Sequence, residues 1–228
     1  MVRGGAHMYD VSVKTAIVGE TGVGKTSFVA RLQYPERPIP KEHTVTIGVD
    51  HAPCIVSIKD PHPLKVKFHI WDTAGQERYA SITRGFYKSA DLVCLMYSCD
   101  DVRSLKQLRH RWWKEVREAA TNLSTAVILV LGNKKDKCMD ERELAEPLKL
   151  LMEDIVADTG RQPVHIRLSA LKDRTVLPVL EAVAWLCANV PSVQATRTML
   201  LKSPRPSSIK LTSATMDPSA RPSWCCRS

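Results

Sequence analysis

Four runs of mostly apolar residues recur along the chain, and a polar or glycine-containing turn follows each of them. The runs cover residues 11–18, 90–97, 125–131 and 164–168. Apolar runs of this length are typical of strands that are buried on both faces of a parallel sheet. We therefore expect them to form the centre of one sheet.

Two further segments show the alternation that is typical of a strand with one buried face. Residues 49–58 and 64–71 flank the turn Asp60–Pro63 and predict an antiparallel hairpin. In the second strand the apolar residues are Val66, Phe68 and Ile70, and the polar residues between them are Lys65, Lys67 and His69. The pattern favours His69 as a solvent-facing strand residue over His69 as a ligand.

Helices are predicted between the strands, where apolar residues recur at every third or fourth position. The segments are residues 26–33, 101–121, 147–159 and 175–189. Pro147 is tolerated at the first position of a helix, and Gly160 is typical of a helix end.

Two of these helices have a clear apolar stripe. In the segment 101–121 the stripe consists of Val102, Leu105, Leu108, Trp112, Val116 and Ala119. Trp113 lies off this stripe, so we expect its side chain to be exposed. In the segment 175–189 the stripe consists of Val176, Val179, Leu180, Val183 and Leu186.

Strands that alternate with helices indicate an α/β fold. We predict a six-stranded, mostly parallel sheet with helices on both faces. This domain is expected to cover residues 9–190, after a flexible N-terminus at residues 1–8. Residues 191–228 contain five prolines and many Ser and Thr without an apolar period, which predicts a disordered tail.

The charge of the chain is concentrated near its end. The formal net charge is +9, and residues 191–228 hold six Lys or Arg against one Asp. This distribution favours a membrane surface as partner over nucleic acid, because the other basic residues are scattered. No apolar run reaches the roughly 20 residues of a transmembrane helix, and no signal peptide is visible. We therefore expect a cytosolic chain with reduced cysteines.

The turn after the first predicted strand carries the first candidate chemistry. Residues 19–26 fit the pattern G-x-x-x-x-G-K-[ST] between a strand and a helix. Backbone N–H groups of such a loop converge on phosphate oxygens, with the positive end of the helix behind them. We expect Lys25 to neutralise the β- and γ-phosphates and the Thr26 hydroxyl to ligate Mg²⁺. The predicted phosphate-binding residues are Gly19, Glu20, Thr21, Gly22, Val23, Gly24, Lys25, Thr26 and Ser27.

Two later turns predict which base is bound. Asn133-Lys134-Lys135-Asp136 follows one strand, and Ser169-Ala170-Leu171 follows the last strand. The Asp136 carboxylate can accept hydrogen bonds from both N1–H and the N2 amino group of guanine, whereas adenine would leave it unpaired. We expect Lys134 to cover the base and Asn133 to tie this turn to the phosphate side. The Ser169–Ala170 backbone is expected to donate to guanine O6.

The remaining site residues are predicted for magnesium and for hydrolysis. Asp72 ends a strand, where a metal-facing carboxylate belongs in a phosphate-loop protein. The Gly75 N–H is expected to meet the γ-phosphate, and Gln76 to orient the attacking water. Thr46, at the end of a proline-rich loop, is expected to complete the metal site. The predicted catalytic residues are Gln76, Lys25 and Thr46, and the predicted metal ligands are Thr26, Thr46 and Asp72.

These motifs, with TIGVD at 46–50, FHIWDTAGQERY at 68–79 and FYKSA at 86–90, resemble those of Rab proteins, which are Ras-superfamily small GTPases. The resemblance covers about residues 9–190. It implies a P-loop GTPase domain that cycles between GTP- and GDP-bound forms, with slow intrinsic hydrolysis, to regulate vesicle traffic. It also implies five kinds of partner: an exchange factor, a GTPase-activating protein, effectors, an escort protein and a dissociation inhibitor.

The end of the chain also resembles that of the Rab proteins. Cys225 and Cys226 match the family's prenylated cysteines. We expect a monomer that does not bind nucleic acid. Its prenylated tail would hold it at the cytoplasmic face of an intracellular membrane, with a cytosolic pool.

The chain departs from the Rab pattern at several positions. His51 stands where the family usually has a Phe of its aromatic effector surface. The family has an aromatic residue against guanine about a dozen residues beyond Lys25, but residues 36–38 here are Glu-Arg-Pro. Leu171 replaces the Lys of the family's Ser-Ala-Lys motif. The loop of residues 34–46 is about two residues longer than is typical.

Two other functions stay open on the sequence alone. One is a Ras-like signalling GTPase, which a single prenyl group on a C-a-a-X sequence at residues 225–228 would favour. The other is a nucleotide-bound interaction module that barely hydrolyses GTP. The presence of Gln76 and Thr46 favours a hydrolysing switch.

Overall fold

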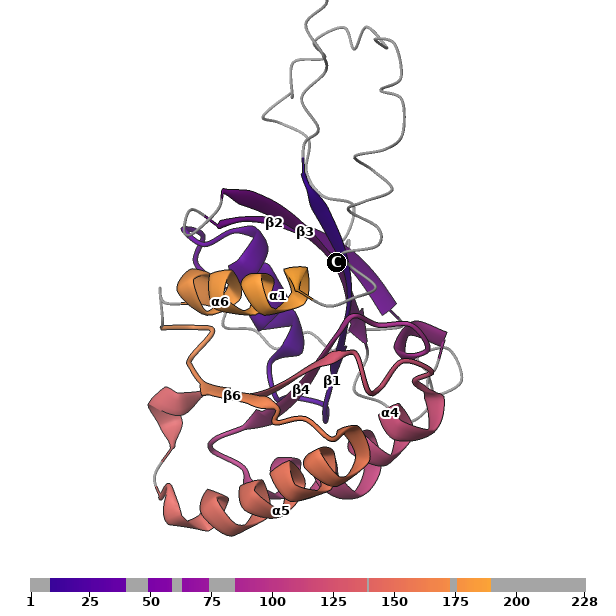
Figure 1. The fold of residues 1–228 in the computed structure, drawn as a ribbon. Coiled ribbons are helices and arrows are strands. Elements are labelled where there is room, and N and C mark those ends of the chain that lie inside the picture. Colours follow the sequence, from indigo (N-terminus) through magenta and orange to yellow (C-terminus); the bar gives the residue numbers. More distant parts are fainter. Residues whose placement is uncertain are drawn as a thin grey trace, which may run out of the picture.

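The computed structural model describes residues 9–39, 49–58, 63–73, 85–138, 140–172 and 176–189. Six strands form one sheet in the order β2-β3-β1-β4-β5-β6 (Figure 1). Their bounds are Val11–Val18 (β1), Val49–Ile58 (β2), Leu64–Thr73 (β3), Leu92–Ser98 (β4), Val127–Asn133 (β5) and Val164–Arg167 (β6). The predicted α/β fold with a six-stranded sheet is confirmed.

β2 is the one antiparallel strand of this sheet. It pairs with β3 from Val49 opposite Thr73 to Ile58 opposite Leu64, as the hairpin pattern predicted. β1, β3, β4, β5 and β6 run parallel to one another, so their carboxyl ends lie at one edge of the sheet. Ligands of such sheets bind outside this edge. The loops that carry the phosphate, Asp72, Asn133–Asp136 and Ser169–Ala170 motifs begin there, whereas the loop of Thr46 follows α1.

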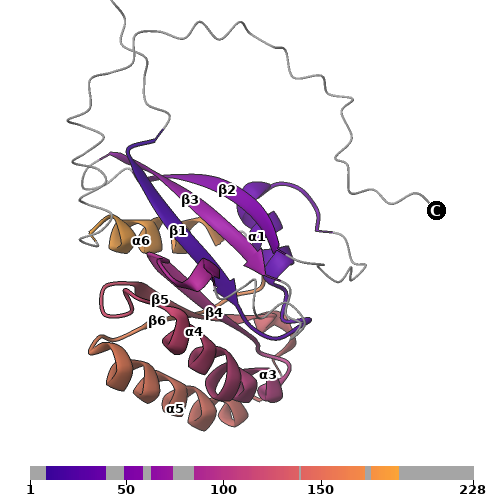
Figure 2. The ribbon, with the colours of Figure 1, turned by 90° about the vertical axis from the view of Figure 1, so that its right-hand side faces the viewer.

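Helices cover both faces of the sheet, as the two views show (Figure 1 and Figure 2). One face carries α1 (Lys25–Gln33) and α6 (Val176–Ala188). The other face carries α3 (Val102–Gln107), the π-helical segment η2 (Leu108–Trp113), α4 (Lys114–Ala119) and α5 (Arg142–Thr159). Each layer of helices closes its own hydrophobic core against the sheet.

The predicted helix over residues 101–121 is helical but not uniform, because its middle is the π-helical segment η2. The predicted exposure of Trp113 is wrong. Its side chain is only 2% exposed, and its Nε1–H donates a 2.8 Å hydrogen bond to Asp158 Oδ2 on α5. A π turn holds more residues than an α turn, so each residue rotates less around the axis. Trp113 therefore follows Trp112 into the interior.

α5 begins at Arg142 and not at Pro147, so its predicted start is wrong. Asp140 Oδ1 accepts a 2.8 Å hydrogen bond from the Arg142 N–H, and this supports an earlier start. Pro147 lies inside the helix, where it cannot donate to the preceding turn. Burial of Leu144 in the added turn offsets that loss. The predicted end is confirmed, because Gly160 follows the helix with a left-handed φ of 68°.

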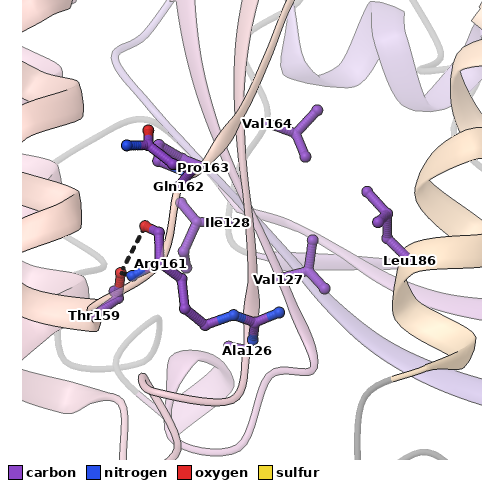
Figure 3. Close-up of a pocket in the computed structure, with 9 residues that line it drawn as sticks. All are labelled: Ala126, Val127, Ile128, Thr159, Arg161, Gln162, Pro163, Val164 and Leu186. Carbon is purple, nitrogen blue, oxygen red and sulfur yellow. Dashed lines mark hydrogen bonds between the residues drawn. The ribbon is translucent and has the colours of Figure 1, made fainter.

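α6 forms where it was predicted, but its apolar stripe is partly wrong. Leu186 is 37% exposed, because the face that meets the sheet continues through Ala184 and Cys187. Leu186 lies beside a cavity of about 80 Å³, which Val164 also lines (Figure 3). This cavity lies at the amino ends of β5 and β6. It is therefore at the opposite edge of the sheet from the predicted motifs.

The predicted flexible N-terminus at residues 1–8 and the predicted lipidated tail at residues 191–228 lie outside the described residues. Within the described part of the chain, no helix combines the length and the apolar character needed to cross a membrane.

Candidate functional site

The phosphate loop, defined as residues 19–26, joins β1 to α1. It runs close to β4: a Cβ on Gly19 would lie 2.1 Å from the Met96 carbonyl oxygen. No side chain fits there, so glycine is required at the first position of the motif. At the other end Gly24 precedes α1 with a left-handed φ of 93°. The turn of the loop brings the first residues of α1 back over the carboxyl edge of the sheet.

Lys25 is the first residue of α1, and its side chain folds back onto the start of the phosphate loop. Its side chain is 6% exposed, and Nζ donates hydrogen bonds to the carbonyl oxygens of Gly19 (2.8 Å) and Glu20 (3.0 Å). A buried ammonium group is costly unless it is hydrogen-bonded, and the loop carbonyls provide these bonds. Phosphate oxygens are acceptors of the same kind and carry negative charge. The geometry thus fits a phosphate group between the loop and Lys25.

Asn133 connects the phosphate loop to the two predicted base-binding turns. Its side chain is buried at the end of β5. Nδ2 donates to the Val23 carbonyl (2.9 Å), and Oδ1 accepts from the Ala170 N–H (2.9 Å). A Cβ on Gly24 would lie 2.4 Å from Nδ2, so the glycine makes room for this amide. The predicted link from Asn133 to the phosphate side is present in the structure.

Asp136 lies in the short 3₁₀ turn η3 (Lys135–Lys137), directly after Lys134 with its left-handed φ of 58°. A hydrogen bond from Ser169 is the largest influence that lowers the pKa of the Asp136 carboxyl. Lys172 lowers this pKa further, with its Nζ 3.3 Å from Asp136 Oδ2. The carboxyl group is therefore ionised at neutral pH and can accept two hydrogen bonds.

A pocket of about 290 Å³ lies between these loops. The predicted residues that line it are Gly24, Ser27, Asn133, Lys134, Asp136, Ser169, Ala170 and Leu171. Ile39 and Lys137 also line it and were not predicted. The sequence does carry a signal for Ile39, an apolar residue held between Pro38 and Pro40 in a polar loop. The phosphate loop thus meets the base-binding turns at one pocket.

The predicted metal and catalytic residues are only partly described. Thr26 is exposed at the start of α1. Asp72 lies on β3 in register with Ile17, which comes two residues before the phosphate loop. A hydroxyl and a carboxylate are hard oxygen ligands of the kind that Mg²⁺ takes alongside phosphate and water. Thr46, Gly75 and Gln76 lie outside the described residues.

A row of rings crosses the outer face of β2 and β3. The ring centroids of His51 and Trp71, and those of Trp71 and Phe86, are 4.6 Å apart. His69 is half-buried on this face, opposite the core, as the alternation predicted, and its Nδ1 lies 3.1 Å from His51 Nε2. Burial, then Lys67, then His51 lower the pKa of His69. His51 therefore keeps the row continuous at the position where the Rab pattern has Phe.

The comparisons with known proteins agree with this geometry. The sequence model of the Ras family matches residues 14–184. The chain is 35% identical to the Ras-related protein Rab-26 of Bos taurus over 150 residues, which are 64% of this chain and 56% of the relative. It is 35% identical to the Ras-related protein SEC4 of Saccharomyces cerevisiae over 133 residues, 58% of each chain.

A third relative is the Ras-related protein Rab-30 of Homo sapiens, with 37% identity over 138 residues, 60% of this chain and 64% of the relative. The chain thus spans between 56% and 64% of the length of these curated relatives. Because the family match covers most of the chain and the relatives are Ras-related proteins, the chain is a Rab-like member of the Ras family.

Proposed function

We propose that the chain binds GTP and GDP and hydrolyses GTP slowly, as a switch that regulates vesicle and membrane traffic. The observation that carries the proposal is the buried amide of Asn133, which bonds to the phosphate loop and to the Ala170 turn together. One guanine nucleotide can then contact the phosphate loop and the base-binding turns at the same time. Membership of the Ras family supports the same function, because its members are GTPases.

Base selection rests on Asp136. The ionised carboxylate accepts from guanine N1–H and N2–H, and adenine has neither donor in that place. In the described structure Lys172 occupies one carboxylate oxygen, so the base takes the place of this ammonium group. The Ala170 N–H is bonded to Asn133 Oδ1, and guanine O6 would share this donor. At Asp136 the base thus replaces the contact of Lys172, and at Ala170 it adds a second acceptor to a bonded N–H.

Phosphate binding rests on Lys25 and the start of α1. The Lys25 ammonium exchanges two loop carbonyls for phosphate oxygens, and the helix N-terminus faces the same charge. Mg²⁺, when bound, would supply positive charge that offsets the charge of the phosphates. We propose that Thr26, Thr46 and Asp72 hold it. The Gly75 N–H and Gln76 are proposed to contact the γ-phosphate and the attacking water.

The role in membrane traffic rests on the Rab-like motifs and relatives. We propose that exchange factors, GTPase-activating proteins and effectors act on the chain. An escort protein and a dissociation inhibitor are proposed for a tail prenylated at Cys225 and Cys226. This would place the chain at the cytoplasmic face of an intracellular membrane, with a cytosolic pool and as a monomer.

The test is a competition followed by a single-turnover assay. GTP and GDP should displace fluorescent mant-GDP from the full chain at concentrations at least a thousandfold below those of ATP. Bound GTP should then be hydrolysed slowly, and Gln76→Leu should keep the binding and lose most of the turnover. Equal displacement by ATP would overturn the base assignment. Equal turnover in wild type and Gln76→Leu would favour the interaction module.

A further inference from the structure

Arg31, in the last turn of α1, bonds to two loops that are far apart in the sequence. Its Nε donates to the Ala170 carbonyl (2.9 Å), and Nη2 donates to the Leu171 carbonyl (3.1 Å). Its Nη1 donates to the carbonyl oxygens of Pro35 (2.7 Å) and Arg37 (3.1 Å). One planar guanidinium group therefore joins the turn after β6 to the segment that follows α1.

Both of these loops form walls of the base pocket. Ala170 and Leu171 line it on one side, and Ile39 lines it two residues after Arg37. Pro35 and Pro38 restrict the backbone between α1 and Ile39. The bonds from Arg31 to residues 35 and 37 therefore also fix where Ile39 lies.

The segment of residues 34–37 is a compact turn against α1. The Tyr34 N–H donates to the Ala30 carbonyl (2.9 Å), and the Arg37 N–H donates to the Tyr34 carbonyl (3.1 Å). The Arg37 guanidinium lies over the Tyr34 ring, 4.4 Å from its centroid. This turn is held to the rest of the site by the side chain of Arg31. A lysine at position 31 would offer one compact ammonium group instead of a planar guanidinium group with several N–H donors.

We propose that Arg31 is a positioning residue that holds both walls of the base pocket and thereby sets how long the nucleotide stays bound. The inference rests on the proposed function. It adds a mechanism of regulation: a partner that pulls residues 34–39 away from α1 would break the Arg31 contacts and loosen the turn of Ala170 and Leu171 at the pocket wall. Movement of the loop and release of the nucleotide are then coupled through one side chain.

The experiment measures the dissociation rate of mant-GDP from the full chain after excess GDP is added. Arg31→Lys should release mant-GDP about ten times faster than wild type, because it loses bonds to one or both walls. The association rate should change by less than about twofold, since the phosphate loop is intact. Arg161→Lys is the matched control. Its guanidinium also donates to a carbonyl, that of Thr125 (3.0 Å), beside the distant cavity of Figure 3.

A double-mutant cycle separates positioning from a general loss of stability. Ile39→Ala should also speed release, and its effect should be much smaller in an Arg31→Ala background, because Arg31 acts through that wall. Ethylguanidinium in solution should restore slow release to Arg31→Ala, and ethylammonium should not.

The outcomes distinguish this inference from the proposed function. If wild type fails to bind mant-GDP, the proposed function is overturned and the inference falls with it. If wild type binds tightly and Arg31→Lys releases at the wild-type rate, the inference alone is overturned. Faster release with fully additive effects of Arg31→Ala and Ile39→Ala, and with no rescue by ethylguanidinium, would also overturn it.

Discussion

The Asp136 carboxylate, which we propose reads the base, is paired in the structure with the Lys172 ammonium, whose Nζ lies 3.3 Å from Oδ2. Asp136→Asn should weaken GTP binding about a hundredfold or more, because its amide N–H₂ would face the donors of guanine. The same amide can donate to the C2 oxygen of xanthine. Xanthosine triphosphate should therefore bind this variant more tightly than GTP does, as measured by displacement of mant-labelled nucleotides.

The matched control for this prediction is Lys172→Gln. It removes the competing ammonium group and keeps the carboxylate. It should therefore still prefer GTP over xanthosine triphosphate. An Asp136→Asn variant with the same preference would show that another group reads the base.

His69 supplies a second residue-scale prediction, on the outer face of β3. Its pKa is lowered by burial first, then by Lys67 and by His51, so it should titrate below the usual 6.5. Because the folded-state pKa lies below the unfolded value, its contribution to stability is full above pH 6.5 and is lost as the pH falls through the folded pKa. Lys67→Gln should bring the pKa of His69 back toward 6.5 in an NMR titration. Lys65→Gln, on the same strand, should move it less.

The site could be predicted from sequence where chemistry follows from local spacing. Lys25 and Asn133 occupy their expected places because each belongs to a motif anchored at a strand end. Arg31 was not predicted, because its partner Ala170 is 139 residues away and its role depends on how two loops meet. Lys172 and Ile39 were not predicted for the same reason: Lys172 contacts Asp136 of another turn, and Ile39 lines the pocket with residues far along the chain.

At the scale of elements, the π-helical segment η2 buries two adjacent tryptophans, and a hydrogen bond to α5 stabilises one of them. Both Trp112 and Trp113 are buried, but only the Trp113 Nε1 has a partner, Asp158, within the described structure. Trp113→Phe should therefore lower the free energy of unfolding by about 1–2 kcal/mol more than Trp112→Phe does, because it also removes a hydrogen bond to a charged group. Urea unfolding of the GDP-loaded chain, followed by circular dichroism, measures the difference. Equal losses would assign no net stabilisation to the Trp113–Asp158 bond.

The elements that were predicted least well are those where a local signal competes with packing. The strands followed from their apolar runs, and β1 was predicted with its observed bounds, Val11–Val18. Pro147 pointed to a helix start, but burial of Leu144 favours the earlier turn. A uniform α-helical period puts Trp113 on the wrong face, because η2 is π-helical. In both cases tertiary contacts outweigh the pattern of one segment.

The whole molecule combines a sheet that the sequence pattern predicts with a strand order that it does not. Alternating strands and helices indicate a parallel sheet, yet the order β2-β3-β1-β4-β5-β6 depends on how the chain crosses over. This order puts β1 between β3 and β4, so the phosphate loop begins beside Asp72 and Met96. The site is assembled at that scale, from loops that follow four different strands.

The last prediction concerns the attachment of the molecule to a membrane. Residues 191–228 lie outside the described structure and carry six basic residues against one acid, with Cys225 and Cys226 near the end. Each buried methylene contributes about 0.8 kcal/mol, but a single moderate chain anchors a protein only marginally. Two prenyl chains would bind firmly, and each basic residue near an anionic leaflet adds up to about 1 kcal/mol. We therefore expect mass spectrometry of the native C-terminal peptide to show two prenyl groups.

Serine substitutions test which cysteine carries the attachment. The double variant Cys225→Ser with Cys226→Ser should move the protein from the membrane pellet to the cytosol. Each single variant should be retained less well than wild type, because one chain anchors only marginally. If Cys225→Ser alone abolishes attachment and Cys226→Ser has no effect, Cys225 carries a single C-a-a-X prenyl group, as in the signalling alternative. An unmodified peptide, together with unchanged membrane recovery of the double variant, would refute the lipidated tail.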